Sequence, residues 1–173
     1  MRFGVLLLLL TFVYGFGLGG LFGAAEDWIK GCLEAGAEEV LDSAYQGDTA
    51  KADKVSSKAW TYFKRAHLHA GGMGAAGLSL VLLLACLPGA PRMKAINSLL
   101  LGLGALGYSS YWMFAGMLAP GMGSTGAAKE ALSWLAIPSA AMFIAGTVIV
   151  LVGFVRSLLL ARVSEEVGGG QGG

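Results

Sequence analysis

Charged side chains are missing from four long stretches of this sequence. The 23 Asp, Glu, Lys and Arg residues all fall outside residues 3–25, 66–91, 95–128 and 131–155. A helix of about 20 apolar residues crosses the hydrocarbon core of a bilayer, where a charge costs roughly 2.5–3.5 kcal/mol or more. We therefore predict an all-α membrane protein, a four-transmembrane-helix bundle that forms a single domain. Its spans are expected at about residues 3–23, 66–87, 96–119 and 131–156.

Charged residues and cysteines are scarce overall. The low charge argues against nucleic-acid binding and ion transport, and the two cysteines are not placed to form a disulfide. With 13% charged residues and a net charge of +1, the chain has no basic stripe long enough to follow nucleic-acid phosphates. The spans contain no acid, lysine or arginine, which leaves a proton relay or ion-coupled transport site unsupported. No reliable catalytic motif is present, which favours a protein without enzymatic activity. Cys32 and Cys86 are expected at opposite membrane faces. A disulfide needs Cα atoms within about 7 Å, so no disulfide is expected between them.

Glycine, in contrast, is abundant, with 28 residues in 173. In a bilayer, small residues let helix backbones approach closely and pack by van der Waals contact. Gly15, Gly19 and Gly23 repeat at a spacing of four in the first span. We expect Gly-rich helix faces to mediate contacts within the chain and with partners, in a homo-oligomer or a larger membrane complex.

The first span also has features of a secretory signal peptide. Arg2 precedes an apolar run, and Gly23-Ala24-Ala25 follows it. The run of about 20 residues is longer than the 7–15 residues of a typical signal peptide. A retained first helix is therefore favoured over a cleaved leader.

Basic residues of the short loops fall on one side of the predicted four-span arrangement. They are Arg2, Arg92, Lys94, Arg156 and Arg162. The positive-inside rule then places both termini and the loop around Arg92 in the cytoplasm, with the protein in the inner membrane. Residues 26–65 would lie outside, and the Gly-rich residues 167–173 would form a flexible tail.

Residues 26–65 are predicted to be helical, with a break at residues 46–48. Apolar residues recur at helical spacing from Trp28 onward, with mostly acidic residues before the break and mostly basic residues after it. Two arrangements are open. One is an external antiparallel hairpin with opposite charges facing each other; the other is an interfacial helix that dips Trp28, Ile29 and Leu33 into the lipid headgroups.

The only two histidines, His67 and His69, lie at the start of the second span. A neutral imidazole can ligate haem iron, copper or zinc, so both residues are candidate cofactor and metal ligands. Because residues i and i+2 of a helix point about 200° apart, the two rings are not expected to share one metal. The alternative is a structural role for both rings at the boundary between lipid and water.

The sequence Ala66-His67-Leu68-His69 resembles small four-helix membrane proteins related to subunit I of haem-copper oxidases. In that group a Gly-rich first span and an outer segment precede Ala-His-x-His and a nearby glycine, here Gly71 or Gly72. The resemblance implies that His67 or His69 ligates a haem b. After the motif, Ala-Gly-Gly-Met-Gly replaces the family's Asn-Leu-Leu-Gly-Trp, and no other span supplies a histidine. A second axial ligand would come from another subunit or a methionine. The methionine candidates are Met73, Met113, Met117 and Met122.

Tyr108 and Trp112 are expected to share one face of the third span, with Tyr111 beside them. Their polar groups could join helices together, or Tyr108 could line a small ligand pocket with His69. Pro138 is expected to kink the fourth span and to free a carbonyl near residue 134.

These features predict a structural, accessory or assembly component of a membrane, with the lipid bilayer as its surroundings. The alternative is a redox module that binds haem or a metal through His67, His69 or both. A third hypothesis is a sensor whose external segment binds a partner.

Overall fold

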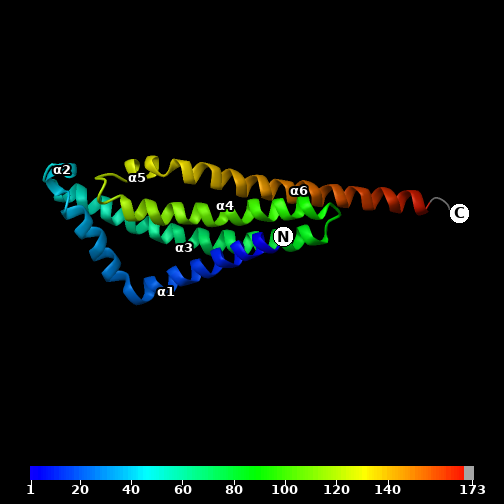
Figure 1. Ribbon diagram of the computed structural model, residues 1–173, viewed down its shortest axis with the longest axis horizontal. Coiled ribbons are helices and arrows are strands. Elements are labelled where there is room, and N and C mark those ends of the chain that lie inside the picture. Colours follow the sequence, from blue (N-terminus) through cyan, green and yellow to red (C-terminus); the bar gives the residue numbers. More distant parts are fainter. Residues whose placement is uncertain (170–173) are drawn as a thin grey trace.

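The computed structural model describes the backbone of residues 1–169 and the side chains of residues 1–162. This part of the chain is entirely helical and contains no strand (Figure 1). Its helices are α1 (Arg2–Glu38), α2 (Leu41–Tyr45), α3 (Thr49–Cys86), α4 (Pro91–Leu118), α5 (Thr125–Ala131) and α6 (Ser133–Gly169). The all-α expectation is confirmed.

Three of these helices are long and apolar enough to cross a membrane, namely α1, α3 and the Ser133–Arg162 part of α6. Helix α4 is the fourth long helix, and its most apolar stretch is less apolar than theirs because glycine, serine and tyrosine residues interrupt it. It packs against α1, α3 and α6. Small or polar residues such as Asn97, Ser98 and Gly104 are buried in these contacts, while Met93 and Met117 are exposed.

The long helices lie side by side along a common axis (Figure 1). Contacts of Gly15 with Gly71 and of Gly4 with Ser98 show that α1 runs antiparallel to α3 and parallel to α4. Leu8, Leu101 and Val150 are fully buried at the centre. The α3–α4 turn lies at one end of the bundle, which we call the turn end, and α2 and α5 lie at the other, the hairpin end.

Glycines set the distance between neighbouring helices. A methyl group placed on Gly74 of α3 would lie 2.9 Å from the Cα atom of Phe12, and one on Gly104 of α4 would lie 2.6 Å from the backbone nitrogen of Phe143. Real Cβ contacts are not this short, so the helix backbones occupy the space of the missing side chains. Gly17, on the outer surface of α1, has no neighbour within 4 Å.

Helix α1 bends at Ala25, whose backbone angles (φ −144°, ψ 28°) are not helical. The first part of α1 diverges from the other helices up to this bend, and residues 26–38 then run back toward the bundle at α2 (Figure 1). The chain then reverses at Gln46 and Gly47, which both have positive φ. Asp48 caps α3 by accepting a hydrogen bond of 2.9 Å from the backbone nitrogen of Lys51. The result is a helical hairpin between residues 26–38 and the first turns of α3.

The two arms of this hairpin meet through apolar side chains. Ile29 and Leu33 pack against Ala59, Trp60 and Phe63 of α3. The expected facing of opposite charges is not seen, since the ion pair among the described side chains joins Lys30 to Glu26 within α1 itself. The positions at which the two arms touch are apolar, so the charged residues lie beside this contact or on the outside. Burial also removes Ile29 and Leu33 from the predicted interfacial arrangement.

The hairpin is attached to the α4–α5 loop by a buried hydrogen bond. The Tyr45 hydroxyl donates to the carbonyl oxygen of Pro120 at 2.7 Å, and burial raises the pKa of this hydroxyl. Gly123, with φ of 67°, lies against Ala44 beside this bond. Ser124 caps the short α5 by accepting hydrogen bonds from the backbone nitrogens of Gly126 and Ala127, and the last long helix begins after α5, at Ser133.

The last helix extends into the predicted flexible tail of residues 167–173, since α6 continues to Gly169. It also continues through Pro138 without a break. Residues 170–173 lie outside the described residues.

We predict that Gly104→Ala destabilises the fold whereas Gly17→Ala does not. Overpacking of a close helix contact costs about 1–3 kcal/mol, while alanine in an open helical position is favoured over glycine by roughly 1 kcal/mol. Thermal unfolding in mild detergent, followed by circular dichroism, should show a lower midpoint for Gly104→Ala only. Equal midpoints for the two variants would contradict the close packing of α4 on α6.

Candidate functional site

His67 lies between α3 and α1. Its Nδ1 atom is 2.7 Å from the carbonyl oxygen of Gly15, and its ring makes an edge contact with Phe22 at 5.8 Å between centroids. A methyl group on Gly19 would lie 2.7 Å from His67 Cε1. Since a carbonyl only accepts hydrogen bonds, Nδ1 of His67 is the donor. The glycine spacing of α1 therefore provides the space for this ring.

His69 points toward α4. Its Nδ1 atom is 2.7 Å from the carbonyl oxygen of Arg65 in its own helix. Its ring lies 5.2 Å from Tyr108 and stacks on Trp112 at 6.0 Å. The expected proximity of His69 and Tyr108 is thus present as a ring-on-ring contact, and Nδ1 is again the protonated nitrogen.

The rings of His67 and His69 lie on different sides of α3, as helical geometry requires. One packs on α1 and the other on α4, so the two imidazoles do not converge on one ion. Among the described residues no group of three or more His, Cys, Asp or Glu side chains could hold a metal ion. Each ring could offer a single Nε2 atom to a metal.

The surroundings of the histidines do not fit a haem. A flat macrocycle would need an open surface at the glycines that follow the histidines, but Gly74 and Gly77 are covered by Phe12 and Leu8 of α1. The backbone of Gly71 lies against Gly15 of α1, and Gly72 is exposed. Among the candidate thioether ligands, the Met113 sulfur accepts a hydrogen bond from the Tyr14 hydroxyl at 3.0 Å. Met117 and Met122 are 55% and 41% exposed, and Met73 packs at the edge of the core.

An aromatic cluster extends from His69 toward the hairpin. Trp112 makes ring contacts with Tyr62 and Tyr111, each at 5.0 Å between centroids. The Arg65 guanidinium lies 4.8 Å from the Trp112 ring centre and 5.5 Å from that of Tyr62. The Trp112 Nε1 atom is buried and has no hydrogen-bond partner among the described residues. The contacts of this cluster therefore join α3 to α4 through aromatic side chains.

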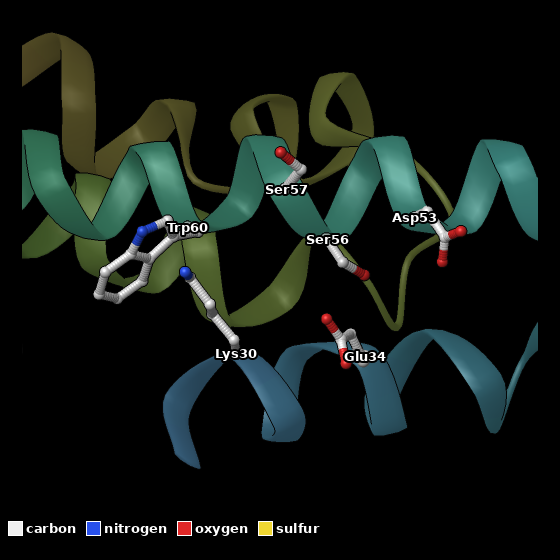
Figure 2. Close-up of a pocket in the computed structure, with 6 residues that line it drawn as sticks. All are labelled: Lys30, Glu34, Asp53, Ser56, Ser57 and Trp60. Atoms are coloured by element: carbon white, nitrogen blue, oxygen red, sulfur yellow. The ribbon is translucent and has the colours of Figure 1, made fainter. Parts of the chain in front are cut away.

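Sequence reasoning did not find the polar cleft in the hairpin. This cleft, of about 280 Å³, lies between α1 and α3 and is lined by Lys30, Glu34, Asp53, Ser56, Ser57 and Trp60 (Figure 2). The Lys30 ammonium is 5.6 Å from the Trp60 ring centre, and its hydrogen bond to Glu26 raises the pKa of Lys30. Ser56 donates to the carbonyl oxygen of Leu33 at 3.4 Å. Glu34 and Asp53 lie on different arms of the hairpin, so the sequence could indicate a shared polar cleft only if the alignment of the two arms were known.

Cys32 and Cys86 are both free and exposed. Cys32 lies in the outer part of α1, in the hairpin, and Cys86 is the last residue of α3, at the turn end. The two cysteines therefore lie at opposite ends of the bundle.

No protein-family model, curated protein or solved structure matches this chain. The class that the fold defines is an all-helical protein with three helices able to cross a membrane by length and composition.

We predict that the purified protein shows no haem spectrum. The chain should give a flat reduced-minus-oxidised difference spectrum in mild detergent after expression with ample haem, because α1 covers the glycine surface beside His67 and aromatic rings cover His69. A Soret band that disappears in His67→Ala or His69→Ala would contradict this expectation and identify the ligand.

Proposed function

We propose that this chain is a multi-pass membrane protein with a structural, accessory or assembly role, which docks on a second copy of itself or on a membrane partner through α3. The observation that carries this proposal is a stripe of small residues on the outer face of α3. It consists of Gly72, Ala75, Ala76 and Ser79, all of which are exposed. Small residues at spacings of three and four allow a second helix to approach closely in a bilayer.

The stripe is distinct from the glycines that hold the chain together. Gly74 and Gly77 on the same helix are already covered by α1, whereas a methyl group on Gly72 would meet no atom within 4 Å. The hydroxyl of Ser79 donates to the carbonyl oxygen of Ala75 at 3.0 Å, so the stripe has no unpaired side-chain donor to be satisfied in lipid. A surface of small side chains therefore remains for a partner helix.

The proposed topology has four spans and places both termini in the cytoplasm of an inner-membrane protein. The lower hydropathy of α4 is compatible with a span because α4 packs against three other long helices. It contains 28 residues and is therefore about 42 Å long, enough for a hydrocarbon core of about 30 Å. Basic residues at the turn end and the mixed charges of the hairpin favour this orientation.

The native cysteines provide a test of this topology. In intact cells, a membrane-impermeant maleimide should label Cys32 in a Cys86→Ser variant, and it should label Cys86 in a Cys32→Ser variant only after permeabilisation. A Met122→Cys substitution in a cysteine-free background, beyond the end of α4, should be labelled from outside. Protection of that residue in intact cells would mean that α4 does not cross the membrane.

We predict that Gly72→Leu with Ala76→Leu weakens association, while Gly17→Leu on the equally open surface of α1 does not. Overpacking costs about 1–3 kcal/mol, which corresponds to a roughly 5- to 150-fold larger dissociation constant and hence to weaker association. Fluorescence energy transfer between labelled copies in vesicles of increasing lipid-to-protein ratio measures this constant.

If wild-type copies do not associate, a cross-linker attached to an Ala76→Cys variant is used to identify the membrane partner. The same leucine variants are then compared for complex formation with that partner. An association that is unchanged in the double variant, or that is lost equally in Gly17→Leu, would contradict docking through α3.

A further inference from the structure

The described charged groups at the turn end of the bundle are all positive. They are the amino terminus, Arg2, Arg92, Lys94 and Arg156. The acidic residues with described side chains lie in the hairpin or at Glu130 near α5, and the other two, Glu165 and Glu166, lie beyond the described side chains. This end of the bundle therefore has a positive potential that attracts an anion.

A cavity of about 170 Å³ opens at the same end, between the end of α3, the start of α4 and α6. Its wall is mostly apolar, with Leu84, Leu87, Leu100 and Ile149 among its residues. Lys94 and Asn97 also line it. A water molecule occupies about 30 Å³, so the cavity has room for a group of several heavy atoms.

Asn97 leaves one acceptor unused in this cavity wall. Only 3% of the residue is exposed, and its Nδ2 atom donates to the carbonyl oxygen of Gly146 at 3.2 Å. Its Oδ1 atom is buried and has no hydrogen-bond partner among the described residues. Buried acceptors are nearly always paired, so this atom is a polar group in the cavity wall that a donor could satisfy.

Lys94 supplies positive charge beside this acceptor. Its Nζ atom donates to the carbonyl oxygen of Ala85 at 3.0 Å, near the end of α3. An ammonium group has three donors, so two remain for an anionic oxygen. Arg92 precedes it on α4, and Arg156 lies one turn beyond Gly153, which also lines the cavity. Exposed Met93 and Ile96 continue the apolar wall along α4.

We infer that this site binds an anionic glycerophospholipid whose headgroup carries a hydroxyl, of the phosphatidylglycerol type. The phosphate lies beside Lys94 and within reach of Arg92 and Arg156, and the headgroup hydroxyl donates to Oδ1 of Asn97. The acyl chains follow the apolar surface formed by Ile96 and Ile149. Basic pockets between membrane helices are a known mode of anionic lipid recognition. The inference rests on the chain lying in a bilayer and is independent of the docking stripe on α3.

The test uses the full chain in nanodiscs that contain equal amounts of phosphatidylglycerol, phosphatidylmethanol and phosphatidylcholine with identical acyl chains. Phosphatidylmethanol has the negative charge without the hydroxyl, and phosphatidylcholine has neither. Native mass spectrometry after gentle detergent extraction counts the lipids that remain bound. We expect the wild-type chain to retain phosphatidylglycerol most, then phosphatidylmethanol, then phosphatidylcholine.

The variants separate charge from hydrogen bonding. Lys94→Gln or Arg156→Gln should lower retention of both anionic lipids by about fivefold, and Lys129→Gln at the hairpin end serves as the matched control. Asn97→Leu should remove the preference for phosphatidylglycerol over phosphatidylmethanol and keep the preference of both over phosphatidylcholine. Thermal unfolding of each variant confirms that it is folded.

Three results would overturn the inference. The first is equal retention of the three lipids by the wild-type chain. The second is loss of anionic lipid in Lys129→Gln to the same extent as in Lys94→Gln. The third is an unchanged hydroxyl preference in folded Asn97→Leu.

Discussion

The close approach of helix backbones at glycine residues is the constraint on which the rest of this structure depends. In a bilayer, lipid tails are as apolar as the side chains, so burial of leucine provides little driving force between helices and van der Waals packing must hold them together. Gly15 and Gly74 bring α1 onto α3, and Gly104 brings α4 onto α6. A side chain at any of these positions would separate two helices and leave gaps along their whole interface.

This packing also decides the environment of the polar groups. His67 fits between α1 and α3 only because residue 19 is a glycine, and the carbonyl oxygen of Gly15 then becomes its hydrogen-bond partner. His69, two residues later, is directed onto the aromatic residues of α4. The histidines thus have partners that packing supplies, and a macrocycle would have to displace α1 to reach the glycines beside them.

The sequence predicts the helical class and the approximate positions of the apolar segments, but not where the helices end. Absence of charge locates the apolar segments well, yet α3 runs from Thr49 to Cys86 across the Lys64–Arg65 pair where a boundary was expected. These long side chains can direct their charges away from the helix, so they do not interrupt it. The short α5 was missed because no apolar period identifies seven residues. The different directions of His67 and His69 followed from helical geometry, and Tyr108 was expected near His69. Gly15 is distant in sequence from His67, and nothing in the residue pattern assigned it as the hydrogen-bond partner.

The continuity of α3 links the hairpin mechanically to the rest of the bundle. A helix of 38 residues is about 57 Å long, almost twice the hydrocarbon thickness of about 30 Å, so a large part of α3 extends beyond the apolar layer in the proposed topology. The same rigid element forms the second arm of the hairpin, packs against the aromatic cluster around Trp112 and presents the stripe at Gly72. The other arm continues from the first part of α1 at the bend at Ala25, and Tyr45 attaches the hairpin tip to Pro120. A partner that moved the hairpin would therefore have to bend α3 or break the bond at Tyr45, and a bend of α3 would also move the docking face that the same helix carries.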